Sequence, residues 1–413
     1  MKLTQFPRSI LPILSKGNRG YYAWLLFLLL IMIWGAGGYA KQLNHGLITT
    51  NMRDSVSWGF YIGNFTFLVG IAAAAVMLVI PAYIYNWKPI KEIVIFGELL
   101  AICAVVMSIG FIIVDIGNPL RFWHMLPGIG TMNFPSSMLS WDFFVLLTYL
   151  TINLVVVIHL LHRIFIKKDY NKKLVLTLVF ISIPMAVAIH TVTAFLYNAI
   201  PARPFWNSAL LAPRFLASAF CSGPAILLIL FQLLRKFTHF EIKDEAIWTI
   251  AELMVYAMFI YLFFSVAELF KEFYSGTEHL LYWQYLLFGI GDNKELVPYS
   301  WASIIMGCIA FVLFLVPKTR KNFTTLNIGA VLIYASVYVE KGIALIIPGF
   351  TPDVLGQIYV YTPSMIEIRT AALIFSLGFL AFTFLVKIAI AIMFEDYHAE
   401  EPIVEQQQSQ QVS

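Results

Sequence analysis

The sequence predicts an all-α integral membrane protein with about ten transmembrane helices. Of its 413 residues, 60% are hydrophobic and only 12% are charged, whereas a soluble domain carries about 25% charged residues. The mean hydropathy is +0.81. The apolar segments are continuous, whereas the lipid-facing and lumen-facing residues of a transmembrane β-barrel alternate. A soluble globular protein and a β-barrel are therefore both excluded.

Ten apolar segments are long enough to span a bilayer, at ~20 residues per crossing. We expect helices over residues 22–40, 57–85, 93–114, 140–163, 173–198, 213–235, 247–270, 299–317, 324–346 and 366–394. Counting alone suggests two four-helix bundles, made of the second to fifth and the sixth to ninth helices, with the first and last flanking them. Residues 1–21 form an N-terminal arm and residues 22–394 the membrane domain. The polar and acidic tail over 395–413 has almost no apolar surface to bury, so we expect disorder there.

The distribution of Lys and Arg predicts the orientation of the helices, because these residues concentrate in short cytoplasmic loops. If ten helices alternate in direction, one set of loops carries most of the basic residues, namely Lys2, Arg8, Lys16, Arg19, Lys88, Lys91, Arg163, Lys167, Lys168, Lys172, Lys173, Lys318, Arg320 and Lys321. The opposite loops hold few, and acids outnumber bases in segment 271–298. Both termini are therefore expected in the cytoplasm.

Three loops on the predicted outer side differ from simple connectors. They cover residues 115–137, 198–207 and 348–363, and all contain proline and aromatic residues. This composition favours ordered caps over flexible tethers. Such caps either receive a partner or ligand, or only seal the ends of the helices.

Ionisable and amide side chains inside the apolar segments are functional candidates, because a charge at the centre of a membrane helix costs at least ~2.5–3.5 kcal/mol. In the predicted outer halves they are Asn64, Asp115, Asp142, His190, Glu268, Glu340 and Lys341, and in the inner halves Glu92, Glu98, Glu252 and Lys387. Glu98 and Asp115 are separated by roughly 26 Å along one helix. They could mark the two ends of a proton route, or could form structural ion pairs.

His190 lies about two turns from the outer end of its helix. At 3.6 residues per turn it shares one polar face with Thr193 and Tyr197. A membrane histidine often forms a hydrogen bond between helices, but an imidazole with carboxylates at the same depth can also transfer protons. A bis-histidine haem site needs two facing histidines, and only His190 lies deep, since His159 and His162 are near the inner end of their helix. We therefore expect no haem in this chain.

Metal and cluster chemistry is not indicated either. Cys103, Cys221 and Cys308 stand alone in apolar segments, without the spacing of a metal site, an iron–sulphur cluster or a redox dithiol. We expect no metal ligands and no cluster. The net charge of +4 gives no indication of nucleic-acid binding in a membrane protein.

The helix over 57–85 combines small residues with polar and aromatic ones. Gly59 and Gly63 are four residues apart, as are Gly70 and Ala74, and this spacing lets helices approach closely. Asn64, with Trp58 and Tyr61 nearby, could equally hold a flat amphipathic ring. Both interpretations stay open on the sequence.

Several segments together resemble the polysulphide reductase membrane-subunit (NrfD/PsrC-like) family. They are Trp58-Gly-Phe-Tyr-Ile-Gly-Asn64-Phe, Asp115-Ile-Gly-Asn-Pro119-Leu-Arg121-Phe, His190-Thr-Val-Thr-Ala-Phe, Arg203-Pro-Phe-Trp206 and Glu340-Lys-Gly-Ile. The resemblance covers most of residues 55–390. Three further segments, Phe122-Trp-His124-Met-Leu-Pro, Asn133-Phe-Pro-Ser-Ser and Ile346-Ile-Pro-Gly349-Phe, are most similar to the DsrP-like subunits of the sulphite-reduction-associated (Dsr) membrane complex.

The resemblance implies a subunit that exchanges electrons between menaquinol in the membrane and a ferredoxin-like iron–sulphur subunit docked on the periplasmic face. Cytochrome and other membrane subunits would complete the complex, in a bacterial inner membrane. The quinone head group would lie near Asn64, Asp115 and His190, with Tyr61 and Arg121 also in its binding site and His190 or Asp115 accepting its protons. Loops 115–139 and 199–212 would contribute to docking. Proton conduction would involve Glu98, Glu252 or Glu268.

Two other classes of function remain open. The buried acids and the Gly- and Pro-interrupted segments also suit a secondary transporter or ion channel, whose substrate site would lie near the midplane between two inverted halves. A purely structural membrane anchor would tolerate apolar replacement of the buried polar residues.

Overall fold

The computed structural model describes residues 12–393 except 74, 127, 239 and 354. Among these residues, ten helices are long and apolar enough to cross a membrane, as the sequence predicts. They comprise α2 (Arg19–His45), the run of α3 (Phe60–Ala73), α4 (Val76–Val79) and η2 (Ile80–Ile84), α6 (Val94–Asp115), α7 (Met138–Phe165), α8 (Lys172–Asn198), α9 (Leu211–Phe237), α10 (Asp244–Ser275), α12 (Val297–Leu315), α14 (Phe323–Val339) extended by η5 (Glu340–Ala344), and α15 (Met365–Met393).

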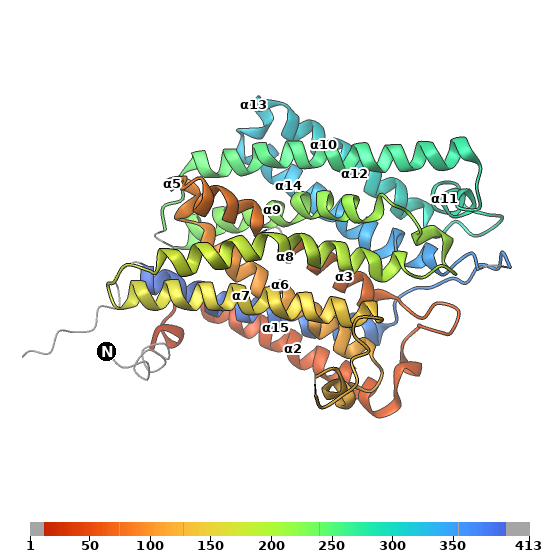
Figure 1. Cartoon of the computed structure of the whole chain (residues 1–413), viewed down its shortest axis with the longest axis horizontal. Coiled ribbons are helices and arrows are strands. Elements are labelled where there is room, and N and C mark those ends of the chain that lie inside the picture. Colours follow the sequence, from red (N-terminus) through yellow and green to blue (C-terminus); the bar gives the residue numbers. More distant parts are fainter. Residues whose placement is uncertain (1–11, 74, 127, 239, 354, 394–413) are drawn as a thin grey trace, which may run out of the picture.

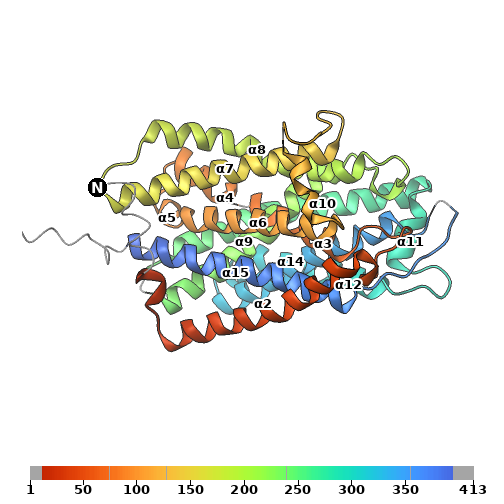
Figure 2. The ribbon, with the colours of Figure 1, turned by 90° about the horizontal axis from the view of Figure 1, so that it is seen from below.

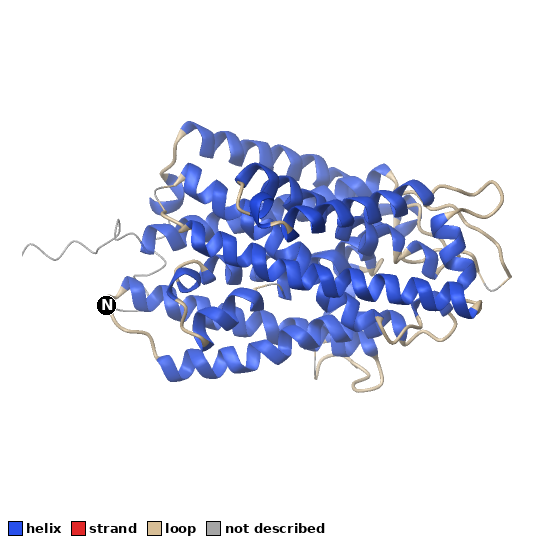
Figure 3. Cartoon of the chain, turned by 90° about the horizontal axis from the view of Figure 1, so that it is seen from above, coloured by secondary structure: helices blue, strands red, loops and turns tan. Residues whose placement is uncertain are grey.

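The helices form two four-helix bundles, as expected from counting. In the first bundle α3 packs against α6 and α8, and α7 packs against the same two helices. In the second bundle α9 packs against α10 and α14, and α12 packs against the same two. Contacts of α9 with α3 and α8 join the bundles, while α2 and α15 pack together beside α6. The long helices run side by side along the molecule (Figures 1 and 3).

Helix α3 lies at the junction of the two bundles and is enclosed on every side. Every residue from Tyr61 to Ala73 is buried, as expected for a helix that is hydrophobic around its whole circumference. It contacts α6 and α8 of the first bundle, and α9 and η5 of the second. Any polar side chain on α3 therefore meets other helices of the protein.

The small residues on α3 permit its close packing. A Cβ atom on Gly63 would lie 2.7 Å from the carbonyl oxygen of Gly342 in η5, and one on Gly70 would lie 3.2 Å from Nζ of Lys341. A Cβ atom on Gly59 would overlap the Tyr361 ring. The expectation that these glycines allow close helix contacts is thus confirmed.

Two membrane helices change to π-helical geometry before they end. The helix expected over 57–85 finishes as the π-helix η2, which contains Pro81. Proline lacks a backbone N–H and disrupts the hydrogen-bonding pattern of an α-helix. The second π-helix, η5, begins at Glu340, where α14 ends. Such wide turns occur frequently at functional sites.

The two ends of the molecule differ in charge. The start of α2 and the end of α15 lie at the same end (Figure 2), and Lys387 of α15 donates a hydrogen bond to the backbone of Lys16 there. The helix connections at this basic end carry Lys88, Lys91, Lys167, Lys168, Lys172, Arg235, Lys236, Lys243, Lys318, Arg320 and Lys321. The tail over 395–413 and most of the N-terminal arm lie outside the described residues.

At the opposite end, the connections form ordered caps. Nε1 of Trp206 in η4 (Pro204–Trp206) donates a 2.8 Å hydrogen bond to the carbonyl of Leu345. The guanidinium of Arg203 lies 4.7 Å from the centre of the Phe350 ring. The cap after α6 includes η3 (Pro119–Met125) and exposes apolar side chains, among them Leu120, which is 83% exposed.

The contact between α3 and η5 yields a matched pair of variants. Gly63→Ala places a methyl group against the backbone of Gly342, whereas Gly342→Ala meets no atom within 4 Å. Overpacking costs about 1–3 kcal/mol. We therefore expect Gly63→Ala to lower the thermal unfolding temperature in detergent and Gly342→Ala to leave it unchanged or slightly higher. Equal effects would contradict the proposed tight contact.

Candidate functional site

The buried polar side chains of the outer half gather where α3 meets α8 of the first bundle and η5 of the second. Asn64, Thr66 and His190 are each 1% exposed, and Lys341 is 2% exposed. We call this group, together with Tyr197 and Tyr338, the junction site. It combines side chains that the sequence places far apart.

Asn64 is held from two sides within the junction site. Its Nδ2 donates a 2.7 Å hydrogen bond to the carbonyl of Phe60, one turn earlier in α3. Its Oδ1 accepts a 2.9 Å hydrogen bond from the hydroxyl of Tyr338 on α14. The Tyr338 ring packs edge-on against Phe67, with centroids 5.0 Å apart. These contacts fix the amide between the two bundles.

Aromatic rings cover the outer side of the junction site. The hydroxyl of Tyr197 on α8 hydrogen-bonds Thr66 on α3. The Tyr197 ring lies 5.7 Å from the Trp58 ring and 5.2 Å from the Trp206 ring. Gly349 allows Trp206 to approach, because a Cβ atom there would lie 1.9 Å from the indole. The outer caps thus close over α3 with flat apolar surfaces.

His190 and Asp142 each have an unpaired polar atom. Nδ1 of His190 lies 3.3 Å from the carbonyl oxygen of Ala186, while Nε2 has no hydrogen-bond partner among the described residues. Thr193, on the same face of α8, donates a 2.6 Å hydrogen bond to Oδ1 of Asp142. Oδ2 of Asp142 has no partner in the described part of the chain. Buried polar atoms are rarely left unsatisfied, so these two atoms suggest a site for a ligand or water.

Tyr61 and Asp115 lie toward α2 and α6. The Tyr61 hydroxyl donates a 2.6 Å hydrogen bond to Gln42, and Gln42 in turn donates to the carbonyl of Val114. Asp115 is partly buried, and its Oδ1 is unpaired within the described residues. Asp115 is the last residue of α6 and directly follows Val114, whose carbonyl accepts the hydrogen bond from Gln42.

A second carboxylate supports the start of α3. Tyr361 donates a hydrogen bond to Glu367 and accepts one of 2.8 Å from the N–H of Phe60. Burial, and then the nearby Glu367 carboxylate, raise the pKa of Tyr361, so its hydroxyl stays protonated as a donor. Glu367 also accepts a 2.9 Å hydrogen bond from the N–H of Asn51. This carboxylate thus joins the outer connection to the last helix.

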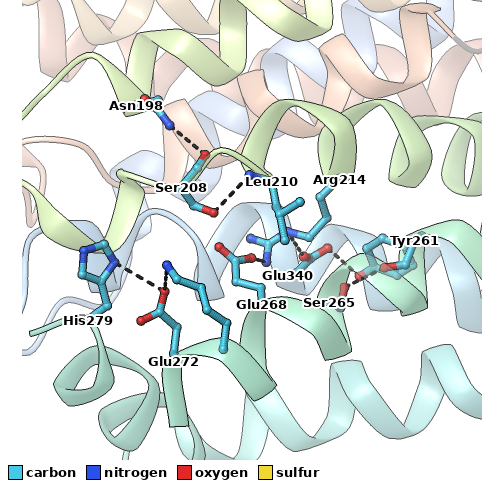
Figure 4. A network of polar contacts seen from close by, with 11 residues as sticks. Asn198, Ser208, Leu210, Arg214, Tyr261, Ser265, Glu268, Glu272, His279 and Glu340 are labelled. Atoms are coloured by element: carbon cyan, nitrogen blue, oxygen red, sulfur yellow. Dashed lines mark hydrogen bonds and ion pairs between the residues drawn. The ribbon is translucent and has the colours of Figure 1, made fainter. Parts of the chain in front are cut away.

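A buried ion cluster lies beside the junction site in the second bundle (Figure 4). Arg214 of α9 pairs with Glu268 of α10, and its Nε lies 3.4 Å from Oε1 of Glu340. The Tyr261 hydroxyl donates a 2.6 Å hydrogen bond to Oε2 of Glu340. Nζ of Lys341, the next residue, contacts the carbonyl of Phe215 at 3.4 Å. The cluster therefore fixes the position of η5.

The remaining predicted residues lie elsewhere. Arg121 is exposed on η3, outside the junction site. The Glu252 side chain is 55% exposed and lies 3.7 Å from Arg320. Glu98 is buried in α6, with Oε2 unpaired among the described residues. Glu268, expected in a proton relay, is the partner of Arg214.

Sequence reasoning missed several members of these networks, among them Arg214, Glu367 and Tyr338. Arg214 and Glu367 occur in the first turns of predicted helices, a position that suggested ordinary interfacial charges. Tyr338 stands among other aromatic residues of α14. One rule could have identified Arg214: an ionisable side chain at the edge of an apolar segment is a functional candidate. Arg214 meets this rule as well as Glu268 does. No sequence signal identified their partners.

Two hollows lie toward the basic end. One of about 530 Å³ is lined mainly by apolar side chains of η2, α4, α9 and α10, including Met77 and Phe220. The other, of about 240 Å³, is lined by polar residues that include Tyr83 and Lys91. Among the described residues, no three His, Cys, Asp or Glu side chains are grouped as a metal ion would require.

The junction site combines flat apolar surfaces with polar groups. Aromatic side chains provide the apolar surfaces, and the Asn64 amide and Tyr338 hydroxyl provide the polar groups. Nε2 of His190 can accept a proton in the neutral tautomer protonated at Nδ1. Such a combination is typical of sites that bind small molecules.

Comparison with known proteins identifies relatives. The sequence profile of the family described as "Polysulphide reductase, NrfD" matches residues 48–352. The chain is 26% identical to a putative membrane subunit of the dimethyl sulfoxide reductase of Halobacterium salinarum, over 89% of this chain and 91% of the relative. It is 25% identical to the integral membrane subunit of the Hdr-like menaquinol oxidoreductase of Archaeoglobus fulgidus, over 84% and 87%. A subunit of the selenate reductase of Mesobacillus selenatarsenatis is 26% identical, over 46% and 51%.

Arg214 and Arg235 allow a test of the ion cluster on a single helix. Arg214→Met leaves the buried Glu268 and the partly buried Glu340 without their guanidinium partner, and breaking a buried ion pair costs about 3–5 kcal/mol. Arg235 pairs with Asp244 at 2.5 Å in an exposed setting, where such a pair contributes about 0–1 kcal/mol. We expect Arg214→Met to lower the thermal unfolding temperature strongly and Arg235→Met to change it little. Similar effects would show that the cluster does not support the fold.

Proposed function

Because the chain belongs to the polysulphide reductase NrfD family, we propose that it is the quinone-interacting membrane subunit of an electron-transfer complex. It is a multi-pass membrane protein, and its relatives are named as subunits of reductase and oxidoreductase complexes. One relative is named as a menaquinol oxidoreductase subunit, which supports menaquinol as the substrate here. The observation that carries the proposal is the unpaired Nε2 of His190, which is buried on α8 where the two bundles meet.

Menaquinol supplies the redox chemistry, and the protein positions the ring and moves protons. Asn64 would bind one ring oxygen through its amide, which Tyr338 orients by a 2.9 Å hydrogen bond. His190 would accept a proton at Nε2. Asp115, with its unpaired Oδ1, is the second candidate acceptor. Tyr61 and its partner Gln42 support the neighbouring wall through a 2.6 Å hydrogen bond.

The electron acceptor would dock on the outer caps. We propose a periplasmic ferredoxin-like iron–sulphur subunit, with cytochrome and other membrane subunits completing the complex. Leu120 and Phe122 on the cap after α6 are 83% and 52% exposed. Exposed apolar side chains are typical of protein contacts when they cluster. Arg121 stands between them and is better suited to this docking surface than to quinone binding.

Proton uptake would begin at the basic end. Glu98 is buried beside Tyr83, and Tyr83 lines the polar hollow of about 240 Å³ that also includes Lys91. The hollow thus provides polar side chains between Glu98 and the basic end. Glu252 is less suited to a relay inside the membrane, because its side chain is 55% exposed.

The charge distribution supports placing the basic end in the cytoplasm, since Lys and Arg concentrate in cytoplasmic loops. The junction site then lies in the periplasmic half of a bacterial cytoplasmic membrane. The likeness of Phe122-Trp-His124-Met-Leu-Pro to DsrP-like subunits favours a role in anaerobic sulphur metabolism. The buried polar groups near one face argue against a midplane transporter site.

Replacement of His190 tests the proposed proton acceptor. In the purified complex, we expect His190→Ala to lower menaquinol oxidation by about 10²-fold or more, as is typical for loss of a general base. Thr191→Ala is the matched control, because the Thr191 hydroxyl bonds only to its own helix, at Val187. Unchanged turnover in His190→Ala, with the complex intact, would remove His190 from the mechanism.

Labelling in intact cells tests the orientation. We would introduce single cysteines at Asp169, in the connection after α7, and at Glu278, in the connection after α10, with Cys103, Cys221 and Cys308 replaced by alanine. A membrane-impermeant maleimide added outside is expected to label Glu278→Cys, and to label Asp169→Cys only after the cells are permeabilised. The reverse pattern would invert the proposed topology.

A further inference from the structure

Lys341 is the only buried lysine among the described residues. It lies in the π-helix η5, immediately after Glu340, and is 2% exposed. An ammonium group has three hydrogen-bond donors, and burying one without good partners is costly. The groups that contact the Lys341 ammonium therefore indicate its role.

The protein partners of Lys341 are weak. Nζ has a long hydrogen bond of 3.4 Å to the carbonyl of Phe215 and lies 4.7 Å from the centre of the Phe215 ring. No carboxylate oxygen lies within ion-pair distance of Nζ in the described part of the chain. Glu340, the adjacent acid, is already bound by Tyr261 at 2.6 Å and lies 3.4 Å from Nε of Arg214. Lys341 is thus a cation without a direct counter-ion among the described residues.

Small residues let this ammonium lie directly against the neighbouring helices. A Cβ atom on Gly70 would lie 3.2 Å from Nζ, and the same position is 3.9 Å from Oγ of Ser222 and from Cα of Ala219. Nζ therefore lies between α3, at Gly70, and α9, at Phe215. Helix α8, which carries His190 with its unpaired Nε2, packs against both of these helices.

We propose that Lys341, reaching in from the second bundle, stabilises the anionic oxygen that forms when the bound quinol loses its first proton. This inference rests on the proposed function. In the step, the O–H bond of the quinol breaks, its proton bonds to Nε2 of His190, and the oxygen keeps the electron pair. No electron moves in this step; the electrons leave later for the iron–sulphur partner.

The charges of the site favour this role over simple binding. Arg214 contacts both nearby carboxylates, Glu268 and Glu340, so among the described residues neither of them forms a direct ion pair with the Lys341 ammonium. A neutral quinol gains little from the ammonium, whereas the developing anion gains much. An interaction that strengthens only as charge develops raises the rate more than the affinity.

The test uses the purified complex in lipid nanodiscs, with menaquinol as substrate. Lys341→Met is expected to lower kcat by about 10²-fold, the loss typical of removing one group that stabilises a developing anion, with KM changed less than about threefold. Lys341→Gln removes the charge but keeps a donor for the Phe215 carbonyl, and is expected to show the same fall in kcat. Lys387→Met, which removes a lysine from α15 at the basic end, is the matched control and should retain activity.

The outcomes separate this inference from the proposed function. If both Lys341 variants keep bound menaquinone and normal kcat, or raise KM with kcat unchanged, the role proposed for Lys341 is wrong while quinone binding stands. If Lys341→Met does not fold, the kcat and KM of Lys341→Gln decide between the same outcomes. If the unmodified complex neither contains menaquinone nor oxidises menaquinol, the proposed function itself fails.

Discussion

The enclosure of α3 is the constraint on which the rest of the structure depends. A helix buried at every residue from Tyr61 to Ala73 has no lipid or water to satisfy its polar groups. Each polar side chain must therefore find a partner on a surrounding helix. Thr66 is paired with Tyr197 inside the first bundle, and Asn64 is paired with Tyr338 of the second bundle. The Asn64–Tyr338 hydrogen bond thus joins the two bundles at the junction site.

The π-helix η5 directs two adjacent, oppositely charged side chains toward different partners. Glu340 and Lys341 are adjacent in the sequence but have different partners: Glu340 contacts Arg214 and Tyr261, while Lys341 lies against Phe215 and Gly70. The carboxylate stays in the ion cluster of the second bundle, and the ammonium reaches the junction. This separation leaves the ammonium against α3 and α9 without a direct ion pair among the described residues. In a low-dielectric interior such a charge acts strongly on any ligand oxygen beside it.

Much of the fold follows from the sequence because hydrophobic length and loop charge are local properties. The ten membrane helices and the two bundles are confirmed, as are the close contacts at Gly63 and Gly70. The rotation of each helix about its axis is not local, since it depends on packing partners. Glu252 lies in an apolar run but is exposed beside Arg320, whereas Arg214 is buried in a cluster that the sequence did not reveal. The π-helical segments at Ile80 and Glu340 were also missed, because an apolar run does not show where its backbone hydrogen bonds change.

The central claim is that quinone binds at the junction of the bundles. Photoaffinity labelling of the purified complex with an azido-quinone, followed by peptide mapping, tests it most directly. The account predicts labels on peptides from α3, the outer half of α8 and η5, and competition by menaquinone. Specific labels confined to the apolar hollow around Met77 and Phe220, toward the basic end, would contradict it.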